Sequence, residues 1–142
     1  MNRYVLDASA LMVFFESRPG ADKVKALLRA AAEARRSLLT AVVNWGEVYY
    51  SVWATRGEAA ANDKAEQIAQ LPIEVVAVDM EMARMAASLK ARHKLPYADS
   101  FAAALAQKHK STLVTTDSDF LRVAKEINIL WANEPERPKM PE

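Results

Sequence analysis

The sequence contains no cysteine and only two histidines among its 142 residues. The absence of cysteine excludes disulfides, a thiolate nucleophile and cysteine-based zinc or iron–sulfur sites. The histidines, His93 and His109, lie among lysines and are too far apart in the sequence to form a metal-binding pair on one helix. A zinc hydrolase is therefore disfavoured.

Long apolar runs are also absent, and none approaches the roughly 20 residues that a membrane span needs. Asp7 and Glu16 interrupt the apolar N-terminal stretch, so it does not have the pattern of a secretory signal. We therefore expect a cytoplasmic protein with no membrane association. The length predicts one domain, and 51% hydrophobic with 26% charged residues is typical of a globular chain with its own core.

The net charge of +1 does not by itself indicate a polyanionic partner. Basic residues nevertheless gather in three places: Lys23, Lys25, Arg29, Arg35 and Arg36; Arg84, Lys90, Arg92, His93 and Lys94; and Lys108, His109 and Lys110. These clusters are explained either by solvated helix faces and helix C-terminal ends, where cations are favourable, or by a nucleic-acid surface. Charge alone leaves both explanations open.

Short apolar strands alternate with amphipathic helices along the chain. We predict strands at residues 3–7, 37–40, 73–78, 112–115 and 127–131, and helices at 8–15, 21–35, 42–55, 58–70, 80–93 and 97–109, with Asp79 as an N-cap and a loop with a short helix at 117–126. This order favours an α/β fold with a mostly parallel sheet. We expect residues 1–132 to form the domain and residues 133–142, which carry three prolines, to form a loose tail.

Four acidic residues, Asp7, Glu47, Asp99 and Asp117, lie in or beside apolar stretches that we expect to be buried. Asp7 and Asp117 follow predicted strands, whereas Glu47 and Asp99 lie near the starts of predicted helices. In parallel sheets, ligands bind at the carboxyl ends of the strands. We therefore expect the four carboxylates to meet at one edge of the sheet.

Each of these acids has a simpler explanation when it is taken alone. Asp7 and Asp117 could be helix caps or turn residues, Asp99 a first-turn acid, and Glu47 could bond to a tyrosine. However, burying a carboxylate without a partner costs several kcal/mol, and no basic residue is adjacent in sequence. Together the four predict an oxygen-ligand site for Mg²⁺ or Mn²⁺, which suits metal-assisted hydrolysis of a phosphodiester.

Four motifs in order match a known family. They are YVLDASAL at residues 4–11, VNWGEV at 43–48, LPYADS at 95–100 and LVTTDSDF at 113–120. With these motifs the chain resembles PIN domains, and specifically the VapC-type ribonuclease toxins of toxin–antitoxin pairs, from residue 3 to about residue 131. The resemblance implies a three-layer α/β/α fold with a five-stranded, mostly parallel sheet.

The resemblance also implies an Mg²⁺- or Mn²⁺-dependent endoribonuclease acting on tRNA or rRNA. Its metal-binding catalytic residues would be Asp7, Glu47, Asp99 and Asp117, with Asp7 and Asp99 as the most direct ligands, and Ser9, Thr115 and Asp119 around them in supporting positions. The implied partners are a second copy of the chain in a homodimer and a VapB-like antitoxin, whose C-terminal segment covers the active site.

Basic residues are expected to hold the phosphates that flank the cleaved bond, with Lys23, Arg29, Arg84, Arg92 and Lys94 as the candidates. Two other functions are less consistent with the sequence. A phosphatase with Asp7 as nucleophile is disfavoured because Ser9 stands where such enzymes usually have a second aspartate. A PIN-like module that binds RNA or protein without cleavage is disfavoured by the intact set of four acids.

Overall fold

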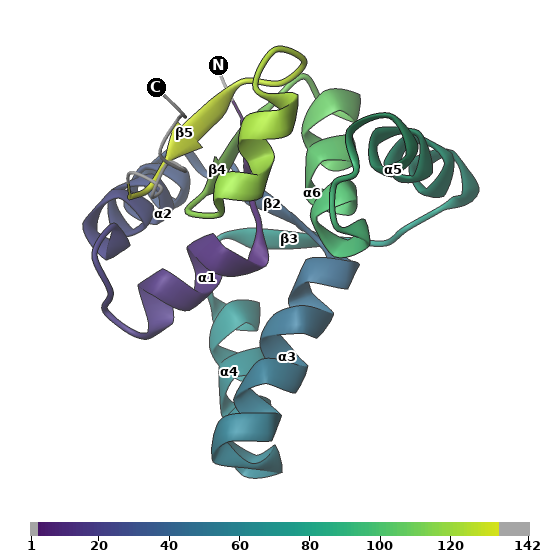
Figure 1. Ribbon diagram of the computed structural model, residues 1–142. Helices are drawn as coiled ribbons and strands as arrows, with labels where there is room; N and C mark the ends of the chain where they lie inside the picture. Colours follow the sequence, from purple (N-terminus) through teal and green to yellow (C-terminus); the bar gives the residue numbers. More distant parts are fainter. Residues whose placement is uncertain (1–2, 134–142) are drawn as a thin grey trace, which may run out of the picture.

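The structure is a computed structural model and describes residues 3–133 of the chain (Figure 1). The strands are β1 (Tyr4–Leu6), β2 (Leu38–Ala41), β3 (Ile73–Val76), β4 (Thr112–Thr115) and β5 (Ile129–Trp131). The helices are α1 (Ala8–Phe15), α2 (Ala21–Ala34), α3 (Val42–Arg56), α4 (Glu58–Gln70), α5 (Met80–His93) and α6 (Tyr97–Lys108), with a 3₁₀ helix, η1 (Ser118–Val123), after β4.

The five strands form one parallel sheet in the order β3-β2-β1-β4-β5. β1 lies in the centre, where Val5 pairs with Leu39 of β2 on one side and with Leu113 of β4 on the other. The chain therefore builds the sheet outward from β1 in one direction, and then returns to its other side. The border between β1 and β4 is the topological switch point, where α/β sheets usually bind their ligands.

Alternating side chains of the strands point to opposite faces of the sheet, as the two-residue period of a strand requires. Val5 and Leu113 pack with the buried side chains of α5 and α6, whereas Leu6 and Val114 pack with those of α1 to α4. This gives the three-layer arrangement that the sequence predicted. Figure 1 also shows that α3 and α4 form a hairpin that extends away from the sheet.

The ends of the elements differ from the prediction by only a few residues. Asp79 caps α5 as expected, because its carboxylate accepts a hydrogen bond of 2.8 Å from the backbone N–H of Met82. The third strand ends at Val76 rather than at residue 78, and the last strand begins at Ile129 rather than at residue 127. No helix within residues 3–133 is both long and apolar enough to cross a membrane. Most of the expected tail at 133–142 lies outside the described residues.

Candidate metal centre

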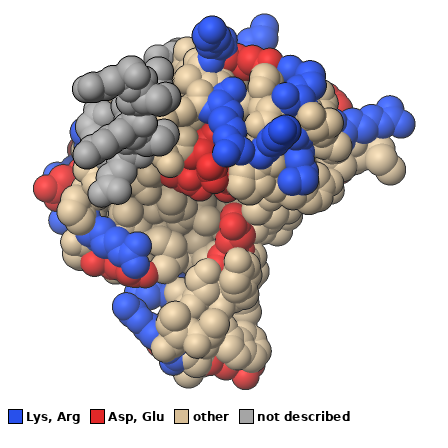
Figure 2. Space-filling view, in the orientation of Figure 1, with Lys and Arg blue, Asp and Glu red and all other residues tan. Residues whose placement is uncertain are grey.

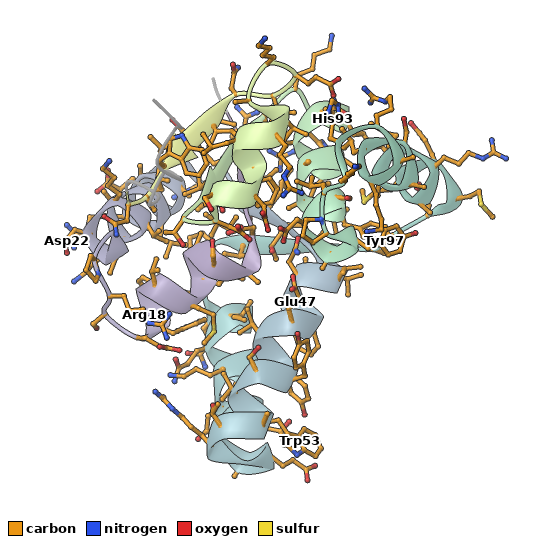
Figure 3. All side chains as sticks on the ribbon, viewed as in Figure 1. Arg18, Asp22, Glu47, Trp53, His93 and Tyr97 are labelled. Atoms are coloured by element: carbon orange, nitrogen blue, oxygen red, sulfur yellow. The ribbon has the colours of Figure 1, made fainter. Side chains whose placement is uncertain are left out.

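The four acids predicted from the sequence lie at the carboxyl edge of the sheet. Asp7 follows β1 directly, and Asp117 lies two residues after β4. Glu47 is in the second turn of α3, and Asp99 is the third residue of α6. α6 leads through a short turn into β4, so its first turn lies at the edge where the strands end (Figures 1 and 3).

Asp7 is 3% exposed and uses both carboxylate oxygens in hydrogen bonds. Its Oδ1 accepts from the backbone N–H of Ala10, at 2.8 Å, and from Ser9 Oγ, at 2.7 Å. Its Oδ2 accepts from Thr115 Oγ1 at 2.5 Å. Burial nevertheless raises the pKa of Asp7 to about 6, because desolvation disfavours the charged form more than these bonds favour it. Asp7 is thus both the cap of α1 and a desolvated acid.

Ser9 and Thr115 connect the ends of β1 and β4. Their hydroxyl oxygens lie 3.1 Å apart. Ser9 Oγ also accepts from the backbone N–H of Thr116 at 2.9 Å, and Thr115 Oγ1 accepts from that of Asp117 at 3.0 Å. Both hydroxyls therefore contribute to a network that fixes Asp7 and the backbone of Asp117 relative to each other.

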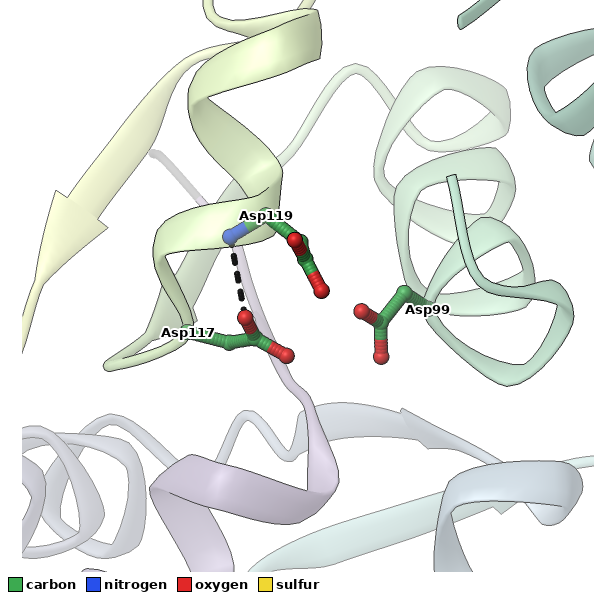
Figure 4. Close-up of side chains that lie close together, drawn as sticks. All are labelled: Asp99, Asp117 and Asp119. Carbon is green, nitrogen blue, oxygen red and sulfur yellow. Dashed lines mark hydrogen bonds between the residues drawn. The ribbon is translucent and has the colours of Figure 1, made fainter. Parts of the chain in front are cut away.

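Asp99, Asp117 and Asp119 converge most closely (Figure 4). Each contributes a carboxylate oxygen, and these three oxygens lie within 4.8 Å of one another. The backbone N–H of Asp119 donates to Asp117 Oδ1 at 2.9 Å, which fixes the turn that begins η1. The sequence had left Asp119 in a supporting position, but the structure brings it into the tightest group, whereas the oxygens of Asp7 are held by hydrogen bonds.

The pKa of Asp99 is raised further above its ordinary value than the pKa of Asp7. Burial, followed by the negative charge of Asp117 and smaller contributions from Asp7 and Glu47, raises the pKa of Asp99 to about 8. Its Oδ2 atom is buried and has no hydrogen-bond partner among the described residues. A buried carboxylate oxygen without a donor, surrounded by other acids, is costly unless the carboxylate takes up a proton or a cation compensates its charge.

Glu47 is half-buried and accepts a 2.9 Å hydrogen bond from Asn44 Nδ2. Within residues 3–133, none of Asp7, Glu47, Asp99 or Asp117 forms an ion pair with a basic residue. The atoms at this edge that could bind a metal ion are carboxylate oxygens, with the hydroxyl oxygens of Ser9 and Thr115 beside them. This set fits a hard divalent cation such as Mg²⁺ or Mn²⁺.

The predicted RNA-binding residues are all exposed: Lys23, Arg29, Arg84, Arg92 and Lys94. Figure 2 shows Lys and Arg side chains gathered next to an acidic patch near the centre of this face. Sequence reasoning missed Arg122, which donates to the carbonyl oxygen of Lys94 at 2.7 Å and lies 3.8 Å from Asp119 Oδ1. Its spacing of three residues from Asp119 on a short helix could have indicated this contact.

Comparisons with known proteins give the family and the fold. A family model described as the PIN domain matches residues 4–126. A search of curated proteins found no match. Among solved structures, the chain is similar to a toxin–antitoxin complex from Klebsiella pneumoniae, with a TM-score of 0.68 and 20% identity, covering 92% of this chain and 98% of that one.

Two further solved structures have the same fold. VapBC2 from Rickettsia felis, bound to a DNA fragment from its promoter, gives a TM-score of 0.73 at 16% identity, over 90% of this chain and 97% of that one. VapC20 from Mycobacterium tuberculosis, a Sarcin-Ricin loop cleaving toxin, gives a TM-score of 0.66 at 18% identity, covering 87% of this chain and 95% of that one. At such low identities these likenesses establish the fold.

Proposed function

Because the chain belongs to the PIN-domain family, we propose that it is a divalent-metal-dependent endoribonuclease and the toxin of a toxin–antitoxin pair. The observation that carries the proposal is Asp99, which is held among other acids with a buried oxygen that has no hydrogen-bond partner among the described residues. Burying Asp99 among other acids does not stabilise the fold by itself. The same group of carboxylates would bind a cation that can act on a phosphodiester.

When bound, Mg²⁺ or Mn²⁺ would offset the negative charge that develops on the phosphate and would lower the pKa of water. The oxygens of Asp99, Asp117 and Asp119 would hold the ion, and Glu47 and Asp7 would complete the negative surroundings. Ser9 and Thr115 would keep the ends of β1 and β4 at a fixed separation through their hydrogen bonds to Asp7.

The proposed substrate is a structured RNA, either tRNA or rRNA. The similarity in fold to a toxin that cleaves the Sarcin-Ricin loop supports this class of substrate. Basic side chains near the acidic patch would hold the phosphates on either side of the cleaved bond, and Arg92, Lys94 and Arg122 are suitably exposed. These contacts would weaken with rising salt concentration.

The proposed partners are a VapB-like antitoxin and a second copy of the chain. The similarity to toxin–antitoxin complexes supports the antitoxin. Large exposed apolar side chains support protein contacts more generally, because Tyr50 and Trp53 on α3 and Tyr97 at the start of α6 are 63%, 45% and 48% exposed.

The test is cleavage of purified tRNA and rRNA with Mg²⁺ or Mn²⁺, compared with EDTA. We expect activity only with metal, and a fall of more than about 100-fold in Asp99→Asn, because even residues that merely support a metal ligand often contribute 10–100-fold. Lys64→Gln, on the distant α4, is the matched control and should keep full activity. RNA binding without cleavage under all metal conditions would instead support a non-catalytic binding module.

A further inference from the structure

Asn44 is a polar residue that the fold buries completely, although it lies in an apolar stretch of α3. Its side chain is 0% exposed, like that of the neighbouring core residue Val48 at 1%. A buried amide is retained at a cost unless its hydrogen bonds serve a purpose. Its partners therefore indicate what it does.

The Nδ2 group of Asn44 donates two hydrogen bonds. One goes to Glu47 Oε1 at 2.9 Å, and the other goes to the backbone carbonyl oxygen of Ala98 at 3.2 Å. A carboxylate oxygen and a backbone carbonyl oxygen are both acceptors. The Nδ2 donor group of the amide, and not its oxygen, must therefore face them. An apolar residue of similar size could fill this space, but it could make neither bond.

The two bonds connect two different parts of the acidic edge. Glu47 is on α3 with Asn44, whereas Ala98 is the second residue of α6 and immediately precedes Asp99. Asn44 therefore connects α3 to the turn of α6 that carries Asp99.

The remaining polar atom of Asn44 is its Oδ1, which is buried and has no hydrogen-bond partner among the described residues. The two side-chain hydrogen bonds that Asn44 makes to described residues both use its Nδ2 donor group, so this group is the part of the side chain that joins α3 to α6.

We propose that Asn44 is a positioning residue that orients the Glu47 carboxylate and the first turn of α6, so that Glu47 and Asp99 face the same divalent cation. The proposal rests on the proposed function, because it assumes the metal site. Asn44 itself does not contact the ion. It acts through the carboxylate of Glu47 and through the backbone next to Asp99.

The test is a double-mutant cycle on Mn²⁺ affinity, measured by electron paramagnetic resonance of free Mn²⁺ in the absence of RNA. Asn44→Leu should weaken Mn²⁺ binding about 10-fold in the otherwise wild-type chain, the lower end of the range for residues that orient metal ligands. In a Glu47→Gln background the same substitution should weaken it much less, because one of its two routes to the ion is already lost. Circular dichroism should show no large fall in melting temperature for Asn44→Leu.

Ser111→Ala is the matched control. Ser111 is also buried, at 6% exposed, and its hydroxyl donates to the carbonyl oxygen of His109 beyond the far end of α6. Its loss should leave Mn²⁺ affinity unchanged. If Asn44→Leu does not fold, the wild-type protein provides the measurement: the side-chain amide signals of Asn44 should shift in ¹⁵N NMR spectra on Mg²⁺ addition, and those of the exposed Asn62 should not.

The outcomes separate this inference from the proposed function. A wild-type chain that binds neither Mn²⁺ nor Mg²⁺ would refute the metal site itself. Wild-type binding with an unchanged Asn44→Leu affinity, or with a static Asn44 amide signal, would overturn only the role of Asn44. An equal loss in both backgrounds would show that Asn44 does not act through Glu47, and would overturn the proposed orientation of that carboxylate by Asn44.

Discussion

Glu126 and Asp99 are carboxylates in two regions that the same fold treats in opposite ways. Glu126, after η1, lies 2.7 Å from Arg92 Nη1 and 3.0 Å from His93 Nε2 at the end of α5. The hydrogen bond from Arg92, followed by a weaker one from His93, lowers the pKa of Glu126. At the acidic edge, burial and neighbouring acids raise the pKa of Asp99 to about 8.

The difference separates an acid that the fold pairs with basic side chains from one that it buries among other acids. The chain supplies cations to Glu126, so this acid connects two segments and is satisfied within the protein. Within residues 3–133 it supplies none to Asp99, although Lys and Arg side chains gather next to an acidic patch on one face of the molecule (Figure 2). In the proposed function a divalent cation from outside the chain compensates Asp99, and the following predictions test this contrast.

The largest expected effect is stabilisation by metal. At a free Mg²⁺ concentration 100 times the Kd, the free energy of unfolding should rise by about 2.7 kcal/mol and the melting temperature by about 5–10 °C. Asp99→Asn should lose most of this rise, whereas Glu126→Gln should keep it. Differential scanning fluorimetry with and without Mg²⁺ measures it. A rise of equal size in Asp99→Asn would place the bound ion elsewhere.

The second expected effect is an unusual pH dependence in the metal-free protein. Asp7 and Asp99 have folded-state pKa values of about 6 and about 8, above their ordinary 3.8. From pH 3.8 up to each raised value, the folded state therefore binds more protons than the unfolded state. The free energy of unfolding should therefore decrease as the pH rises from about 4 to about 8, by about 2 kcal/mol or more.

The contribution of Glu126 to the free energy of unfolding changes with pH in the opposite direction. Because its pKa is lowered from 4.5, its contribution is present above that pH and is lost as the pH falls below it. Urea unfolding in EDTA across the pH range measures both trends. In Asp99→Asn the decrease toward pH 8 should become shallower. A flat profile in the wild-type chain would mean that the acids are not desolvated as the structure indicates.

The smallest expected effect compares the two neutralised acids at pH 8 in EDTA. Asp99→Asn should stabilise the chain by about 1 kcal/mol, because it removes a repelled charge and solvent screening reduces the gain. Glu126→Gln should destabilise it by no more than about 1 kcal/mol, as is typical of exposed ion pairs. Urea unfolding measures both. Destabilisation by Asp99→Asn would instead indicate a structural role for that acid.

Much of the fold could be predicted because local patterns determine it. The strand Tyr4–Leu6 and the capped helix after Asp79 both follow from side-chain periodicity and capping chemistry. The placement of Asp7 and Asp117 at strand ends, and of Asp99 in a first helical turn, was also predictable. The parallel sheet then brings them to one edge without further information.

The sequence could not predict which of the acids lie closest together, because this depends on distances between side chains from separate elements. Asp7 lies next to two hydroxyl donors, one of which, Thr115, is more than 100 positions away in the sequence. Asp119 approaches Asp99 only through the tight turn of η1. Asn44 was visible as a polar neighbour three residues before Glu47, but its bond to Ala98 requires the packing of α3 on α6.

The pairing of β1 with β4 has a consequence for synthesis of the protein. Val5 is aligned with Leu113, so the ribosome must add more than 100 further residues before β1 meets this neighbour. At about 5–20 residues per second, the acidic edge stays incomplete for several seconds of translation. Any prematurely terminated chain that ends before β4 also lacks Asp117 and Asp119, so it should bind no Mn²⁺ at this edge and leave cellular RNA intact. For the toxin proposed above, this order of assembly would delay activity until β4 and the turn after it have been synthesised.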